Sequence, residues 1–71
     1  MPSGAELPDL SKLTTREWQI VMRLQVGERI DQVAKALHLS PSTVRNHLTA
    51  VYRKLGVHSQ AELLVLLLRH E

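Results

Sequence analysis

One short segment of this 71-residue chain carries side chains suited to binding a polyanion. Its polar and cationic residues recur at i, i+3, i+4, i+7 and i+11, which places them on one face of a helix. They are Ser42, Arg45, Asn46, Thr49 and Arg53. Arginine can bond guanine O6 and N7 together, and asparagine can bond adenine N6 and N7. An ordinary exposed helix face mixes Glu with Lys, whereas residues 41–58 contain no acid, so this face suits phosphates and base edges.

The positive charge of the chain is concentrated in the same segment. Residues 41–58 carry three basic side chains and no acidic one, and these are Arg45, Arg53 and Lys54. Residues 1–40 balance five basic with five acidic side chains, and residues 59–71 hold one basic and two acidic. Residues 41–58 therefore carry a charge of +3 in a chain whose net charge is +2, and this concentration points to an anionic partner.

Other chemistries find little support in the composition. The absence of cysteine excludes disulfides and thiolate metal sites. The histidines are not spaced four apart on one helix, so no metal site is predicted from His38, His47, His58 and His70. A catalytic pocket is hard to build in so short a chain with one Trp and one Tyr. We therefore expect no enzyme, no metal and no cofactor.

The chain also lacks the features of a membrane or secreted protein. Its longest apolar run, residues 63–68, falls far short of the roughly 20 residues that a membrane span needs. No basic start followed by an apolar stretch predicts a secretory signal. We expect a cytoplasmic protein, associated with the nucleoid if its partner is DNA. Residues 1–11, with Pro2, Gly4 and Pro8, are interpreted as a flexible lead-in or linker, and residues 12–71 as one domain.

Three helices are predicted up to the end of the basic segment. The first begins at a capping box formed by Thr14 and Glu17 and ends at Gly27. The second covers residues 30–37, with apolar side chains at helical spacing and no obvious cap. The third covers residues 41–55, with Ser40 as N-cap and a proline at its first position. Its buried face is formed by Val44, Leu48, Val51 and Leu55.

A fourth helix is predicted over residues 60–70, after a second capping box at Ser59 and Glu62. Its six consecutive apolar residues cover more than one turn, so they cannot all face one core. The spacing directs Leu63, Leu64 and Leu67 inward. The outward set, predicted as a dimer interface, is Val65, Leu66 and Leu68. The predicted fold class is therefore all-α with four helices.

At this point the chain resembles the LuxR/GerE-type helix–turn–helix domain of bacterial transcription regulators, over residues 13–69. The resemblance rests on the order and spacing of several motifs. They are Leu13-Thr14-x-Arg16-Glu17, Gly27, Val33-Ala34-x-x-Leu37, Ser40-Pro41-Ser42-Thr43-Val44-Arg45-Asn46-His47 and Lys54-Leu55-Gly56-Val57. The resemblance implies a tetrahelical fold within the winged-helix-like superfamily, in which the third helix enters the DNA major groove and the fourth joins two domains.

The resemblance also assigns roles to positions of this chain. The base-contacting positions are Arg45, Asn46 and Thr49, which are three of the five residues that the spacing places on the polar face. DNA-backbone contacts are predicted for Ser42, Thr43, His47, Arg53 and Lys54. For His47 the alternative is a packing residue that is hydrogen-bonded at the helix interface. The predicted partners are double-stranded DNA and a second copy of the chain, with RNA polymerase as a further candidate. The chain is then the output domain of a NarL-like response regulator or a standalone GerE-like protein.

Two other functions remain open at this stage. The helix–turn–helix scaffold can serve as a protein-interaction adaptor, with residues 63–68 as its operative surface. A sigma-factor-like promoter-recognition domain shares a similar start and turn, although the helix that follows Gly56 favours the LuxR type. Salt-dependent binding of DNA separates the adaptor from the DNA-binding functions, and dependence on core RNA polymerase separates the sigma factor from the regulator.

Overall fold

The computed structural model describes residues 10–70, and all regular structure within them is helical. A short 3-10 turn, η2 (Leu10–Lys12), precedes four α-helices: α1 (Thr15–Gln25), α2 (Ile30–Leu37), α3 (Pro41–Leu55) and α4 (Gln60–His70). The all-α, four-helix prediction is confirmed. Most of the lead-in predicted over residues 1–11 lies outside the described residues, and its last two positions belong to η2.

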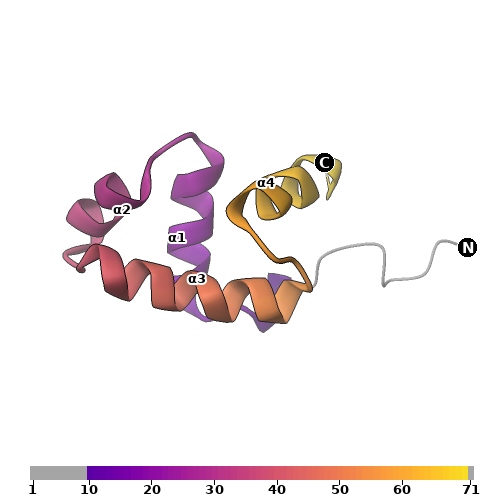
Figure 1. Ribbon diagram of the computed structural model, residues 1–71, viewed down its shortest axis with the longest axis horizontal. Helices are drawn as coiled ribbons and strands as arrows, with labels where there is room; N and C mark the ends of the chain where they lie inside the picture. The colour runs from indigo at the N-terminus through magenta and orange to yellow at the C-terminus, as the bar shows by residue number, and fades with distance from the viewer. Residues whose placement is uncertain (1–9, 71) are drawn as a thin grey trace, which may run out of the picture.

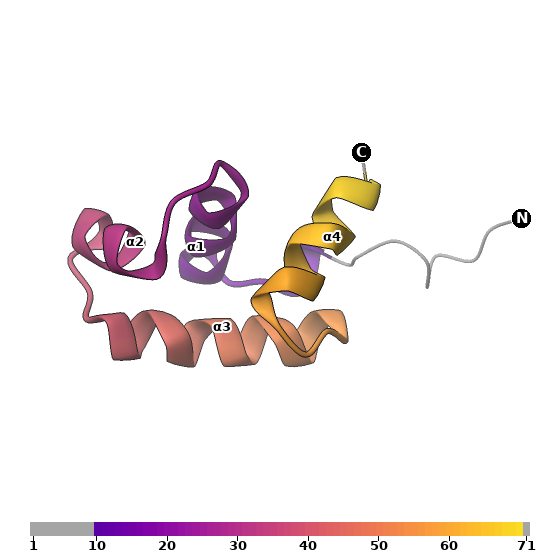
Figure 2. The same ribbon diagram turned by 45° about the horizontal axis from the view of Figure 1, so that its top comes forward.

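The other three α-helices pack against α3, the longest helix (Figure 1). It packs against α1, α2 and α4, while α1 also packs against α2 and α4. In both ribbon views α1, α2 and α4 lie on the same side of α3 (Figure 2). The opposite side of α3 faces away from these three helices, and its residues are exposed from the first turn to the last.

The helix ends follow the predicted caps. At the start of α1, Thr14 Oγ1 accepts a hydrogen bond from the Glu17 amide at 3.1 Å, and Glu17 Oε1 accepts one from the Thr14 amide at 2.9 Å. At the start of α3, Ser40 Oγ accepts from the Thr43 amide at 3.1 Å, with Pro41 in the first turn. Gly56 ends α3 in the left-handed region, with φ at 73°. These satisfied termini hold α3 to the predicted length.

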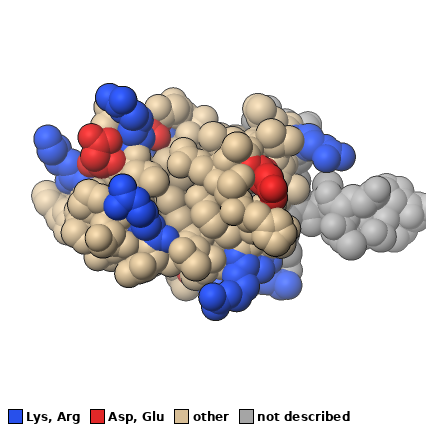
Figure 3. All heavy atoms as spheres, in the orientation of Figure 1, with Lys and Arg blue, Asp and Glu red and all other residues tan. Residues whose placement is uncertain are grey.

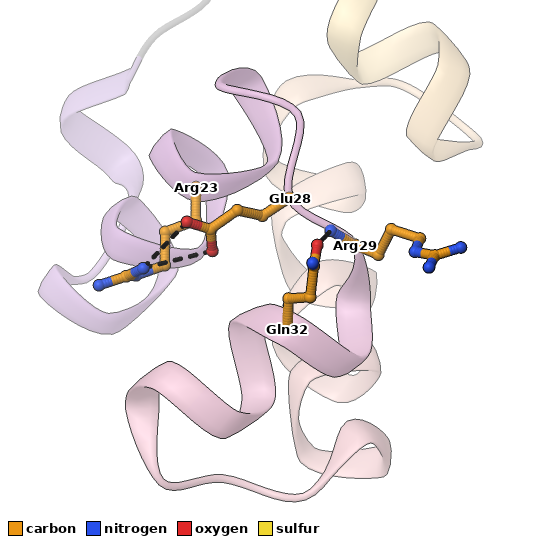
Figure 4. Close-up of polar contacts among 4 residues, drawn as sticks. All are labelled: Arg23, Glu28, Arg29 and Gln32. Carbon is orange, nitrogen blue, oxygen red and sulfur yellow. Dashed lines mark hydrogen bonds and ion pairs between the residues drawn. The ribbon is translucent and has the colours of Figure 1, made fainter.

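The start of α2 and the turn before it use contacts that the sequence analysis did not identify. Gln32 supplies the missing cap, because its side-chain oxygen accepts a hydrogen bond from the Arg29 amide at 2.8 Å (Figure 4). Gly27 adopts a φ of 101°, and the turn closes when the Glu28 amide donates to the Arg23 carbonyl at 3.1 Å. The Arg23 guanidinium also pairs with the Glu28 carboxylate at 3.1 Å.

The turn between α2 and α3 holds an unusual residue. His38 adopts the left-handed conformation, with φ at 60°, and it is the only residue other than glycine to do so among residues 10–70. The Leu39 amide then donates to the Ala34 carbonyl at 2.8 Å, which closes the end of α2. A side chain in this region costs backbone energy that glycine avoids, so the turn that presents α3 carries strain.

The buried core is formed by apolar residues that recur at helical spacing in each helix. Each helix contributes fully buried apolar side chains, and together these are Ile20, Val21, Leu24, Val33, Ala34, Val44, Leu48, Val51, Leu63 and Leu67. Predicted core residues that are only partly buried pack at its edge: Ile30, Leu37, Leu55 and Leu64. Trp18 of α1 is 40% exposed at the edge of the core. Among residues 10–70, no helix is both long and apolar enough to cross a membrane.

Helix α4 is oriented as the leucine spacing predicted. Leu63 and Leu67 are buried, whereas Val65 is 52% and Leu68 67% exposed. The second capping box forms only in part: Ser59 Oγ accepts from the Glu62 amide at 3.1 Å, but the Glu62 carboxylate accepts from the His58 amide at 2.9 Å. Glu62 reaches one residue further back than the box requires, which ties the incoming loop to the helix.

Candidate nucleic-acid interface

The uncovered side of α3 is the polar face predicted from the sequence. All five members of that face are exposed: Ser42, Arg45, Asn46, Thr49 and Arg53. The apolar residues Val44, Leu48 and Val51 of the same helix are buried against the other helices. The core thus fixes the rotation of α3, and this rotation leaves the five polar side chains in solvent. We call these five residues the polar face of α3.

Thr49 and Thr43 are constrained by hydrogen bonds within the helix. The Thr49 hydroxyl donates to the Arg45 carbonyl at 3.0 Å, so its proton is already used. It can still accept a hydrogen bond, and its methyl group can contact the methyl group of thymine. Thr43 is half-buried, and its hydroxyl lies 2.9 Å from the hydroxyl of Ser40 in the first turn.

The cations of the polar face lack internal counterions. Within residues 10–70 the ion pairs are Arg23 with Glu28 and Lys54 with Glu17, so neither Arg45 nor Arg53 is paired. In the space-filling view, Lys and Arg side chains project from several parts of the surface, and at the lower edge, beneath the C-terminal half of α3, no acidic side chain stands out among them (Figure 3). An exposed, acid-free surface of this kind attracts anions.

Two residues predicted to contact the DNA backbone lie on a different flank of α3. His47 and Lys54 are seven positions apart, which puts them on one side of the helix, and both are only half-exposed. Lys54 Nζ lies 2.7 Å from Glu17 Oε1 of α1. Burial alone would raise the pKa of Glu17, but the hydrogen bonds from Lys54 and the Thr14 amide, with the charges of Lys54 and His47, outweigh it and hold the pKa below its ordinary value.

Glu17 is the functional candidate that the sequence analysis missed. It is 4% exposed, and it is the only buried charged residue among the side chains that the structure describes. A signal was present, because position 17 extends the buried stripe of α1 by one turn, at i, i+3, i+4 and i+7 with Ile20, Val21 and Leu24. The sequence analysis assigned Glu17 only the role of a helix cap, and therefore did not predict that its side chain is buried.

The outward face of α4 has a different composition. Ala61, Val65 and Leu68 are exposed at i, i+4 and i+7, which forms an apolar stripe. A shallow groove of about 360 Å³ runs beside it, lined by Val57, Ala61, Glu62, Val65, Leu66 and Arg69. Leu66, predicted in the outward set, is half-buried in this groove. Val65 and Leu66 therefore share this groove, whereas Leu68 is exposed on the apolar stripe and does not line the groove. The dimer contact stays a prediction.

No cluster that could hold a metal occurs in the described part of the chain, because no three His, Asp or Glu side chains gather there. The predicted DNA-contacting residues fall into two groups instead. Six of them lie on the polar face or at its start, and His47 and Lys54 lie on the flank that faces Glu17. The base-contacting and backbone-contacting roles stay predictions.

Comparisons with known proteins agree with this geometry. The family model for bacterial regulatory proteins, luxR family, matches residues 11–67. The chain is 33% identical over 69 residues to the response regulator UvrY of Escherichia coli (strain K12), an alignment that covers 97% of this chain and 31% of UvrY. It is 38% identical over 61 residues to the HTH-type transcriptional regulator MalT of Yersinia pestis (strain Pestoides F), covering 86% of this chain and 7% of MalT. The chain thus spans less than a third of the length of either relative.

Proposed function

Since this chain belongs to the luxR family of bacterial regulatory proteins, we propose that it is the DNA-binding module of a transcription regulator. The observation that carries the proposal is the polar face of α3, which is exposed along the helix and contains two unpaired arginines and no acid. The major groove of DNA is wide enough to admit an α-helix and displays hydrogen-bonding groups that differ between base pairs. We propose that α3 lies in that groove.

Arg45, Asn46 and Thr49 are the residues proposed to read bases. Arg45 donates two hydrogen bonds to O6 and N7 of a guanine, and Asn46 pairs with N6 and N7 of an adenine. Thr49 accepts from a base amino group or contacts a thymine methyl group, because its own proton is bonded to the Arg45 carbonyl. Specificity then comes from three side chains that neighbour one another on the polar face of α3.

Backbone contacts are proposed for residues at the two ends of the polar face. Ser42 and Thr43 lie in the first turn of α3, and Arg53 lies in the last. Such contacts orient the helix on the duplex without reading sequence. His47 and Lys54 were predicted with this group, but a phosphate would have to compete for Lys54 with a buried carboxylate 2.7 Å away.

We further propose that two copies associate through α4, with Val65, Leu66 and Leu68 at the contact. The support is the apolar stripe of Ala61, Val65 and Leu68 on α4, which is exposed among the described residues, and the adjoining groove that Leu66 lines. A patch of this size falls short of the roughly 1,000 Å² expected of a stable interface, so the contact forms mainly when both copies are on DNA. Two domains would then bind half-sites about one helical turn apart.

The alignments with UvrY and MalT cover only a part of each relative, so the activity of a whole regulator, its input signal and its partners are matters of proposal. We propose that the module delivers the output of a longer transcription regulator, and RNA polymerase stays a predicted partner. The adaptor function is a second candidate, because the exposed stripe of α4 would suit another protein as well as a second copy. A sigma-like function is disfavoured by the presence of α4 after Gly56.

Selection of bound duplexes from a random pool tests the proposal. The chain is expected to enrich one sequence and to bind it at least about 10³-fold more tightly than random DNA at physiological salt. Its affinity should fall linearly as the logarithm of the salt concentration rises. Failure to enrich any sequence, with no salt-dependent binding to random DNA, would contradict the proposal and favour the adaptor.

A further inference from the structure

The ion pair between Glu17 and Lys54 lies where two helices meet. Glu17 occupies the first turn of α1, and Lys54 occupies the last turn of α3. In Figure 2 the first turn of α1 is the part of that helix nearest to α3. The N-terminal end of a helix favours a carboxylate, and the C-terminal end favours a cation. Each partner therefore suits the helix end that carries it.

One oxygen of Glu17 joins the two helices. Glu17 Oε1 accepts from the Thr14 amide at 2.9 Å and from Lys54 Nζ at 2.7 Å. The first contact completes the cap of α1, and the second crosses 37 positions of sequence to α3. A movement of α3 along or around α1 would break the second contact and leave the carboxylate buried without its cation.

A buried carboxylate makes this contact sensitive to geometry. The Glu17 side chain is 6% exposed, compared with 32% for Lys54, so the carboxylate depends on Lys54 more than Lys54 depends on it. An unpaired buried charge is strongly unfavourable. Buried apolar residues of α1 and α3 also pack together in the core, and such contacts are not directional. The pair thus adds a directional contact between α1 and α3.

The neighbouring residue provides a contrast. Arg53 is exposed, belongs to the polar face and has no ion-pair partner among the described residues. Lys54 follows it directly, on the flank that faces α1. Both are basic residues in the last turn of α3, but only Arg53 is free to meet a phosphate.

We propose that Lys54 acts in DNA binding as a positioning residue: with Glu17 it holds α3 at a fixed orientation on α1, and it does not itself contact DNA. The inference rests on the proposed function, because it concerns how α3 is presented to the major groove. It changes the role expected of Lys54 from the sequence and gives Glu17 a role in DNA binding.

A double-mutant cycle tests this inference. Lys54→Met, Glu17→Gln and the double variant are compared with the wild type, and Arg53→Met is the matched control in both backgrounds. Binding to a duplex selected from a random pool is measured as a function of salt. Each phosphate contact contributes about 0.9 to the slope of log K against log salt. Thermal unfolding followed by circular dichroism shows that each variant is folded at the binding temperature.

The expected results differ for the two basic residues. Arg53→Met should reduce the slope by about 0.9 in both backgrounds. Lys54→Met should leave the slope unchanged and lower affinity for the selected duplex by roughly 3- to 30-fold, the range seen for substitutions that act on a ligand from a distance. In the Glu17→Gln background, Lys54→Met should have almost no further effect, because the ion pair is already absent.

Other outcomes overturn the inference in distinguishable ways. If Lys54→Met reduces the slope by about 0.9 in both backgrounds, Lys54 contacts a phosphate and only this inference fails. Unchanged affinity in Lys54→Met also overturns it, since a positioning residue must affect binding. If Lys54→Met is unfolded, the double variant replaces it, because the double variant has no unpaired buried charge. Its salt slope is compared with that of Glu17→Gln. A shallower slope in the double variant overturns the inference. If even the wild type lacks salt-dependent binding, the proposed function itself fails.

Discussion

Helices α3 and α4 each bury one face in the same core and expose the other, but their exposed faces differ in chemistry. The outward side of α3 carries hydroxyl, amide and guanidinium groups, whereas the outward side of α4 carries Val65 and Leu68. Charged groups bind through forces that salt weakens, and apolar groups bind through burial, which salt does not screen. One small domain thus presents two surfaces. Binding to the polar surface should weaken as salt rises, whereas association through the apolar surface should depend on the protein concentration.

The largest effect is expected from a charge on the apolar surface. Leu68→Glu, at a position that is 67% exposed, should leave the domain folded. It should lower affinity for a duplex with two half-sites on the order of 100-fold, because joined binding events gain that much or more. Affinity for one half-site should stay within about twofold. Fluorescence anisotropy with the two duplexes measures both.

Gln19→Glu is the control for this substitution, since it adds the same charge at an exposed position of α1. It should bind both duplexes as the wild type does. A Leu68→Glu variant that unfolds would mean that Leu68 is part of the core. One that binds both half-sites as tightly as the wild type would locate the dimer contact elsewhere.

The next effect concerns the polar face and separates its two kinds of contact. Arg45→Ala should cost about 1–3 kcal/mol on the selected duplex and relax the preference at one base pair. Arg53→Ala should weaken binding to selected and random DNA alike and reduce the salt dependence by about one charge. Equal losses on the two kinds of DNA for both variants would contradict these roles.

A smaller effect is expected at the cap that starts α3. Ser40→Ala removes the acceptor for the Thr43 amide, so the free energy of unfolding should fall by about 0.5–2 kcal/mol. Ser42→Ala makes the same chemical change two positions later at an exposed site and should stay within about 0.5 kcal/mol. Urea denaturation measures both, and equal midpoints would show that Ser40 does not stabilise the helix.

The smallest effect is a gain in stability at the turn before α3. His38 has a φ of 60°, where a side chain costs about 1–2 kcal/mol, and the extra freedom of glycine in the unfolded chain offsets part of that cost. His38→Gly should therefore stabilise the domain by up to about 1 kcal/mol. Ala36→Gly, within α2, should destabilise it by about 0.5–1 kcal/mol. If both variants lose stability, the His38 side chain makes a contribution that outweighs its backbone strain.

The sequence was sufficient for the features that depend on neighbouring residues. The ends of α1 and α3 followed from Thr14, Ser40 and Gly56, because a cap acts within one turn of the residue that provides it. The rotation of α4 followed from the spacing of Leu63 and Leu67. The polar face of α3 could be recognised for the same reason, since its residues share one helix.

The features that the sequence did not predict depend on tertiary contacts or on strain. The ion pair between Glu17 and Lys54 joins residues 37 positions apart, so no local sequence pattern predicts it. In the sequence, Lys54 and Arg53 are both basic residues at the end of α3. Only the packing of α1 against α3 shows that Lys54 is paired with Glu17 and that Arg53 is not. The left-handed His38 could not be expected either, because glycine is the residue that normally signals this conformation.

The proposed contact between Arg45 and a guanine in the major groove is tested most directly with 7-deazaguanine, because this base lacks the N7 acceptor. Each guanine of the selected duplex is replaced in turn, and the affinities of the wild type and of Arg45→Ala are measured. At one position the wild type should lose about tenfold or more, within the 1–3 kcal/mol of such a contact, while Arg45→Ala loses nothing. If the wild type tolerates the replacement everywhere, or Arg45→Ala loses as much as the wild type, the account is contradicted.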